Sequence, residues 1–286
     1  MVNNMNVFKT VLLLTLLTLL LVWIGKMIAG TQGMLVAFCF VLILNMASYW
    51  YSDKIVLSMY RAREITYSQD PRVFEIVKRL TTEAHLPMPK IYLIPSQALN
   101  AFATGRNPQH AAVALTQGIL DLLKDDELEG VLAHELSHVK NNDILISSVA
   151  ATLAGAIFLL ANIARFGAIF GGMGGRKRDG NLIGLLIISI VAPLAALLIQ
   201  LAISRSEEFR ADKKGALLTK KPLSLASALE KLQALSLKKP MAANPTTAHM
   251  FIVNPLNGKG ITTLFSTHPP IEQRVKKLEE IAREIQ

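Results

Sequence analysis

The stretch that decides the chemistry of this chain is residues 131–143, which read Val-Leu-Ala-His-Glu-Leu-Ser-His-Val-Lys-Asn-Asn-Asp. It contains a His-Glu-x-x-His pattern, with His134 and His138 four residues apart and Glu135 between them. On a helix, side chains four positions apart lie one turn apart on the same face. The two imidazoles can therefore bind one metal ion, and Glu135 can contact a water molecule on that metal.

The residues around the pattern predict a helix. Lys124 and the acidic residues 125–127 precede an apolar run, where a helix dipole favours negative charge. Leu128, Val131 and Leu132 then form an apolar stripe. The alternative is a helix that carries two surface histidines by chance. The chain has only 6 histidines, so finding two of them at this spacing, with glutamate in the required position, favours the metal site.

A catalytic zinc ion needs a third protein ligand and an open position for water. Residues 204–212 read Ser-Arg-Ser-Glu-Glu-Phe-Arg-Ala-Asp, and they place Glu208 and Asp212 four residues apart, on one helix face. One carboxylate could bind the metal while the other orients a ligand histidine through its second ring nitrogen. The alternative is a solvated, charged helix start just outside a membrane segment.

The His-Glu-Leu-Ser-His sequence, followed downstream by Ser-Arg-x-x-Glu-Phe-x-Ala-Asp, resembles the HtpX family of membrane zinc proteases, which are related to the CAAX prenyl endopeptidases. Residues 100–105 and 266–270 also match this family, and the resemblance covers nearly the whole chain. It implies that Glu208, and not Glu207, is the third zinc ligand. It also maps Asp212 onto the aspartate that closes the family pattern.

The resemblance implies two further site elements. The segment Asn100, Ala101, Phe102, Ala103 and Thr104 would be a sheet edge that binds substrate as an added strand. An ordinary inner strand is the alternative. His268, which precedes two prolines, would approach the zinc site and stabilise the oxyanion of the tetrahedral intermediate. A structural histidine that caps the following helix is the alternative there.

These residues predict a hydrolytic mechanism. His134, His138 and Glu208 would hold one Zn²⁺ per chain and leave the fourth position to water. Glu135 would accept the proton of that water and pass it to the leaving amine. Asp212 would fix the orientation of a ligand histidine.

Composition indicates a membrane protein. Of the 286 residues, 51% are hydrophobic, and mean hydropathy is positive. The formal net charge of +9 fits contact with anionic lipid, and we find no nucleic-acid-binding motif. The single cysteine, Cys39, lies in an apolar run, which excludes an intramolecular disulfide and fits a reducing compartment for the soluble part.

Four hydrophobic runs divide the chain. We expect a transmembrane hairpin at 1–52, the first part of a cytoplasmic protease domain at 53–143, a second hydrophobic hairpin at 144–203, and the second part of the protease domain at 204–286. Lys54, Arg61 and Arg63 favour a cytoplasmic domain and cytoplasmic termini. The third run covers 144–164 and ends at Arg165; the second hairpin could span the membrane twice or be re-entrant.

The predicted fold is therefore a mainly α membrane protein with about four hydrophobic helices and an α+β, zincin-like cytoplasmic domain. Asp70 and Pro71 open a predicted helix that runs to Ala84. Residues 90–94, 100–104 and 111–115 are predicted strands, and a terminal helix is expected from 270 to 285.

The resulting hypothesis is a multi-pass zinc metalloendopeptidase of a bacterial-type inner membrane. Its partners would be the lipid bilayer and protein substrates, with no nucleic acid and an oligomeric state that the sequence leaves open. The family resemblance implies cleavage of membrane or misfolded proteins in quality control and stress response. The alternatives are a CAAX-type prenyl-peptide endopeptidase and a non-catalytic membrane scaffold with a metal site.

Overall fold

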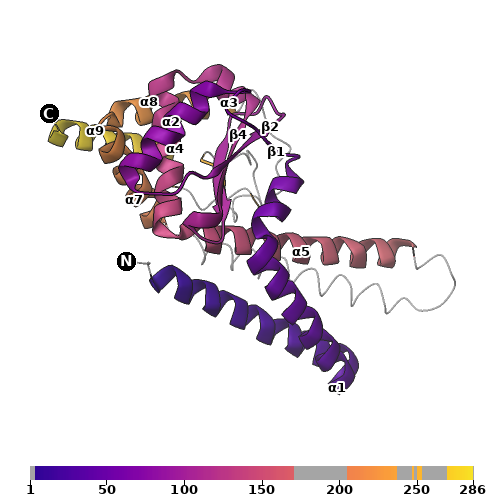
Figure 1. Ribbon diagram of the computed structural model, residues 1–286. Coiled ribbons are helices and arrows are strands. Elements are labelled where there is room, and N and C mark those ends of the chain that lie inside the picture. Colours follow the sequence, from indigo (N-terminus) through magenta and orange to yellow (C-terminus); the bar gives the residue numbers. More distant parts are fainter. Residues whose placement is uncertain (1–3, 171–204, 237–246, 248–249, 253–268, 286) are drawn as a thin grey trace.

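The computed structural model describes residues 4–170, 205–236, 247, 250–252 and 269–285 of the chain. These residues form a long apolar helical hairpin below a mostly helical domain that contains one small sheet (Figure 1). The predicted combination of apolar helices with an α+β domain is thus confirmed at this level. Residues 171–204, which hold most of the predicted second hairpin, and His268 lie outside the described residues.

The hairpin is helix α1 (Asn4–Met59), which bends at Ala29 and Gly30. Gly30 has a φ of 60°, a left-handed conformation that glycine adopts without a steric penalty. The two arms, Phe8–Met27 and Ala29–Met59, are each long and apolar enough to cross a membrane. The second arm runs past the expected boundary at residue 52, because the helix continues without a break to Met59.

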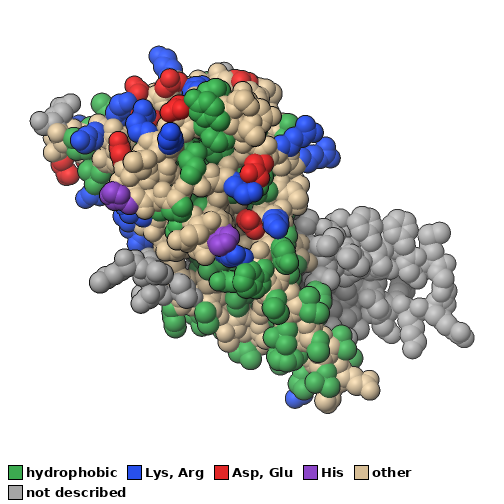
Figure 2. Space-filling model, viewed as in Figure 1, with side chains coloured by type: hydrophobic (Ala, Val, Ile, Leu, Met, Phe, Trp, Pro, Cys, Tyr) green, Lys and Arg blue, Asp and Glu red, His purple; other side chains and the backbone are tan. Residues whose placement is uncertain are grey.

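Helix α5 (Asp143–Phe170) packs against the first arm of α1 through apolar side chains such as Leu13, Leu17 and Val149. Arg165 lies within this helix, so the helix continues past the predicted end of the third hydrophobic run. In Figure 2, hydrophobic side chains cover the lower part of the molecule, over α1, and charged side chains gather on the domain above it. This division matches a helical anchor below a water-exposed domain.

The sheet has four strands in the order β1-β2-β4-β3. Strand β1 (Arg63–Glu64) is antiparallel to β2 (Lys90–Ile94), β2 is parallel to β4 (Ala111–Thr116), and β4 is antiparallel to β3 (Ala101–Gly105). The strand prediction is confirmed to within one residue at each end. Strand β3 lies at the edge of the described sheet, and a short 3₁₀ turn, η1 (Pro108–His110), joins it to β4.

Helices pack against the sheet and against one another around one apolar core. The described helices of this layer are α2 (Pro71–Ala84), α3 (Gln117–Leu122), α4 (Asp125–Asn141), α7 (Arg205–Thr219), α8 (Pro222–Ser236) and α9 (Ile271–Ile285). Asp70 caps α2 by accepting a hydrogen bond from the Val73 amide at 3.1 Å, which confirms the predicted helix start. Helices α4 and α7, far apart in the sequence, lie side by side in this core, and they carry the candidate site.

Candidate metal centre

Helix α4 presents the His-Glu-x-x-His pattern in a buried position. The Glu127 carboxylate accepts a hydrogen bond from the Lys124 amide at 3.1 Å, which satisfies a backbone donor at the helix start. His134 and Glu135 are buried, and His138 is partly exposed. The imidazole rings of His134 and His138 lie edge to face, with centroids 4.8 Å apart, because a four-residue spacing places both on one side of the helix.

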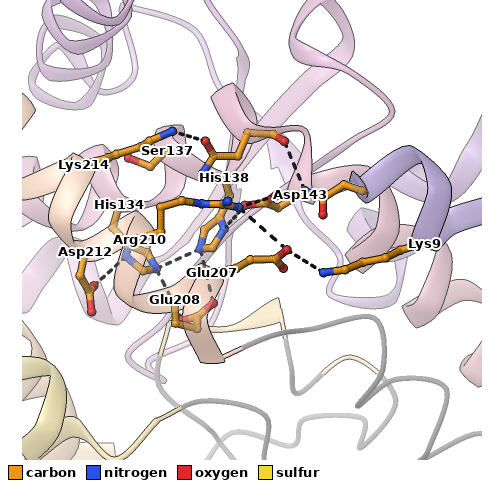
Figure 3. Close-up of polar contacts among 12 residues, drawn as sticks. Lys9, His134, Ser137, His138, Asp143, Glu207, Glu208, Arg210, Asp212 and Lys214 are labelled. Carbon is orange, nitrogen blue, oxygen red and sulfur yellow. Dashed lines mark hydrogen bonds and ion pairs between the residues drawn. The ribbon is translucent and has the colours of Figure 1, made fainter. Parts of the chain in front are cut away.

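Helix α7 brings the third candidate ligand to this face. Its Gly215 lies so close to α4 that a Cβ there would approach the His134 amide nitrogen to 3.0 Å. The absence of a side chain at Gly215 lets the two helix backbones approach closely. Glu208 and Asp212, both buried, then lie against the two histidines, as Figure 3 shows. Glu207, by contrast, pairs with Lys9 at 2.9 Å.

Three ligand-type atoms converge at the centre of the site. The His134 and His138 Nε2 atoms lie 3.2 Å apart, and the Glu208 carboxylate lies 3.5 Å from His138 Nε2 and 3.9 Å from His134 Nε2. Ligands of a tetrahedral zinc ion, each 2.0–2.2 Å from the metal, are separated by about 3.3 Å. The side chains therefore fit a metal ion, and they form the one group of this kind within the described residues.

The orientation of His134 is fixed from behind the ring. Its Nδ1 lies 2.9 Å from Asp212 Oδ1, so that Nδ1–H can donate to the carboxylate while Nε2 faces the site. Arg274, fully buried on α9, holds the same carboxylate with Nε and Nη2 at 2.8 and 2.7 Å. Burial alone would raise the pKa of Asp212, but Arg274 and His134 outweigh it and lower the pKa to about 2.

His138 has a carboxylate partner of its own. Its Nδ1 lies 3.3 Å from Oδ2 of Asp143, the first residue of α5. Burial lowers the pKa of His138, but the Asp143 hydrogen bond and the nearby Glu208 and Glu135 carboxylates outweigh it and raise the pKa to about 9. Burial lowers the pKa of His134, although Asp212 acts in the opposite direction. This anionic surrounding favours a cation at the centre of the site.

Glu135 is the carboxylate that can act as a base here. Its burial, with Glu208 close by, raises its pKa to about 8, although His138 acts in the opposite direction. The Ala103 backbone hydrogen-bonds to this side chain from β3. A cavity of about 30 Å³, large enough for a water molecule, is lined by residues including Glu135, both histidines and Glu208.

The predicted substrate strand borders this cavity. Ala103 lines it, and the neighbouring Phe102 packs against Tyr60 and against Phe251, which also lines the cavity. The Ala101 carbonyl accepts a hydrogen bond from the Ile252 amide at 3.3 Å, so part of the β3 edge is already paired. Asn100 precedes the strand, and Thr104 contacts Ser148 on α5 at 2.7 Å.

Sequence reasoning missed Asp143 and Arg274. Arg274 carried a usable signal, since it lies in the apolar stripe of Ile271, Val275 and Leu278, where a basic residue needs a buried partner. Asp143 had the signal of an acidic residue directly after the motif helix, but it could equally have been a helix cap.

Comparison with known proteins identifies the family. The model of "Peptidase family M48" matches residues 67–282. The "Protease HtpX homolog" of Syntrophobacter fumaroxidans is 54% identical over 95% of this chain and 98% of its own length. The "Protease HtpX homolog" of Persephonella marina is 54% identical over 98% of both chains.

A solved structure shares the fold at lower identity. S. mikatae Ste24p superposes with a TM-score of 0.54 and 19% identity, covering 92% of this chain and 62% of that one. At this identity the likeness concerns the fold. The family match and the long, close relatives together show that this chain belongs to peptidase family M48 and is a membrane-anchored metalloprotease.

Proposed function

We propose that this metalloprotease is a zinc endopeptidase with one zinc ion held by His134, His138 and Glu208. The observation that carries the proposal is the convergence of these three ligand atoms within 4.8 Å in a buried site. Two imidazoles and one carboxylate are a ligand set typical of catalytic zinc. When bound, the zinc ion would polarise the scissile carbonyl and lower the pKa of a water molecule.

Glu135 would be the general base and then the general acid. Its carboxylate lines the same cavity as the three ligands, so it can accept a proton from water and return it to the leaving amine. Its raised pKa supports a group that exchanges protons near neutral pH, with the metal lowering that pKa when present. His268 stays a proposed donor to the oxyanion.

The substrate would bind as an extended segment beside β3. Ala103 is the part of this strand that lines the cavity, and its backbone contacts Glu135. A peptide that adds to the β3 edge would bring its carbonyl next to the base. Because Ile252 already pairs with Ala101, the available edge would be centred on Ala103.

The cellular setting belongs to the same proposal. The protease domain and both termini would face the cytoplasm, with the chain crossing an inner membrane several times. Lys54 near the end of α1, with Arg61 and Arg63 just after it, supports this orientation through the positive-inside rule. The substrates would be membrane or misfolded proteins, and the role would be quality control under stress, as the resemblance to HtpX proteases suggests.

The test compares the wild type with Glu135→Gln, both purified under metal-replete conditions in mild detergent. We expect about one zinc per chain in both and chelator-sensitive cleavage of a disordered protein in the wild type only. The kcat of the variant should fall by about 10²–10⁴-fold, the usual contribution of a general base. A wild type without zinc would contradict the proposed metal site. Cleavage of a farnesylated peptide, but of no unmodified protein, would favour the prenyl-peptide alternative.

A further inference from the structure

We propose that the first turn of α1 is part of the metal centre, with Asn6 positioning Asp143 and Asp143 orienting the ligand His138. The inference rests on the proposed function, because it treats His138 as a metal ligand. It assigns to residues at the start of a membrane helix a role beyond anchoring. Both Asn6 and Asp143 would be positioning residues, since they act on the metal through His138.

Asp143 is placed to fix the His138 ring. Its Oδ2 lies 3.3 Å from His138 Nδ1, and 5% of its side chain is exposed. A carboxylate accepts but does not donate, so Nδ1 must carry the hydrogen and Nε2 must face the metal site with its lone pair. Asp212 has the same relation to His134. Each candidate ligand histidine therefore has a carboxylate behind it.

Asn6 holds Asp143 in place from a different element. Its side-chain amide donates to Asp143 Oδ1 and, at 3.3 Å, to the carbonyl of Asn141. Asn141 ends α4, the helix of the motif, and Asp143 begins α5 after a left-handed residue at 142. One amide group thus ties together the end of the motif helix and the carboxylate that orients His138.

The position of Asn6 needs an explanation, which this contact supplies. Asn6 is 1% exposed at the start of a helix whose following residues are strongly apolar. Burying an amide there costs free energy unless it has hydrogen-bond partners. Its amide nitrogen has two partners at the α4–α5 junction, and both belong to the protease domain. The first turn of α1 is therefore fixed on the site rather than on lipid.

Nearby charges support the same junction. Arg210 Nη2 lies 3.6 Å from Asp143 Oδ1 and 3.9 Å from Glu207, and Lys9 pairs with Glu207 at 2.9 Å (Figure 3). Lys9 lies three residues after Asn6, so two residues near the start of α1 contact elements that carry the site. Arg210 Nη2 is buried as well, so Asp143 Oδ1 lies between a guanidinium from α7 and the side-chain amide of Asn6 from α1.

A purely structural tether is the competing explanation, and Asn45 provides a matched control. Asn45 also lies in α1, and its side-chain amide donates to Thr18 at 3.0 Å between the two arms of the hairpin. In both asparagines the side-chain oxygen has no hydrogen-bond partner in the described part of the chain. Asn45→Ala thus removes a similar hydrogen bond without touching the metal centre.

The experiment uses the full-length wild type, Asn6→Ala and Asn45→Ala in mild detergent. We would measure the rate of zinc release to a chelator and the visible spectrum of the cobalt-substituted proteins, together with the thermal midpoint of unfolding. We expect Asn6→Ala to release zinc about tenfold faster and to show an altered cobalt spectrum, as loss of outer-shell partners usually does. Asn45→Ala should match the wild type in both metal measurements, whatever its thermal midpoint.

A paired exchange separates positioning from tethering. Asn6→Asp combined with Asp143→Asn restores an amide–carboxylate contact between the two positions but removes the carboxylate from His138. We expect the thermal midpoint to recover relative to Asn6→Asp alone, while zinc release stays about tenfold or more above the wild type. Wild-type zinc release in this double variant would overturn the orienting role of Asp143.

The outcomes distinguish failure of this inference from failure of the proposed zinc endopeptidase function. A wild type that binds no zinc would overturn the proposed function and the inference together. A wild type with one zinc, combined with an Asn6→Ala variant of equal zinc release and cobalt spectrum, would overturn only the inference. Equal acceleration of zinc release by Asn6→Ala and Asn45→Ala would also overturn it, because the effect would then follow hairpin stability alone.

Discussion

The two histidines of the candidate metal centre are supported by opposite ends of the chain. The His134 ring is hydrogen-bonded to Asp212, and the fully buried Arg274 of the last helix donates two hydrogen bonds to that carboxylate. The His138 ring contacts Asp143, whose carboxylate accepts a hydrogen bond from the neutral side-chain amide of Asn6 in the first turn of α1. The first support is a charged pair inside the protein core. The second lies where the apolar hairpin meets the protease domain.

This difference implies that the two halves of the site respond to different perturbations. The Asp212–Arg274 pair is shielded by α7 and α9, so it should be indifferent to the surroundings of the hairpin. The Asp143–Asn6 contact depends on how α1 sits against α5. Because breaking a buried ion pair leaves an unpaired charge, the first support should also be more important for folding than the second.

The largest effect should follow removal of Arg274. Arg274→Met would leave Asp212 buried without its cation, at a cost of about 3–5 kcal/mol in the free energy of unfolding. Asn6→Ala should cost about 1–3 kcal/mol, the penalty for an unpaired polar group. Denaturant titration of both variants in detergent would measure these values. Equal destabilisation by the two variants would contradict the proposed difference between the supports.

Zinc affinity should fall for both aspartates, and further for Asp212. Asp212→Asn and Asp143→Asn each keep a hydrogen-bond acceptor but remove the negative charge behind a ligand histidine, for which about 10–100-fold is typical. Asp212→Asn also removes the closest charged partner of Arg274, whose guanidinium is then left with Glu208, a proposed zinc ligand 3.8 Å away. Chelator competition would measure both affinities. A larger loss for Asp143→Asn would reverse the ranking of the supports.

Sequence patterns were sufficient for elements that depend on local residue spacing. The motif helix, the helix opened by Asp70 and Pro71, and the strands around residues 90–94 and 111–115 follow from periodicity and capping. The structure also brings Glu208 to the two histidines. The partners of Asp143 could not be predicted in this way. Asn6 lies 137 positions from Asp143 in the sequence, and no local pattern predicts that the first turn of α1 contacts the α4–α5 junction.

Acid should weaken the Asp212 support before it unfolds the protein. The folded pKa of about 2 lies below the value of about 3.9 in an unfolded chain, so the ionised carboxylate stabilises the folded state above about pH 4. This contribution, about 2 kcal/mol, is lost as the pH falls from about 4 through 2. In metal-free protein, the stability difference between wild type and Asp212→Asn should shrink as the pH falls from about 4 to 2. A difference that grows on acidification would contradict this sign.

The smallest effect should come from the ion pair at the other support. Lys9 and Glu207 are 2.9 Å apart, but 27% of the Lys9 side chain is exposed, so water screens their attraction. Lys9→Met should therefore cost about 1 kcal/mol or less. A double-mutant cycle with Glu207→Gln would isolate the pair from other effects of each substitution. A coupling energy well above 1 kcal/mol would show that the first turn of α1 is held by charge as well as by Asn6. The two supports would then be more alike than their burial suggests.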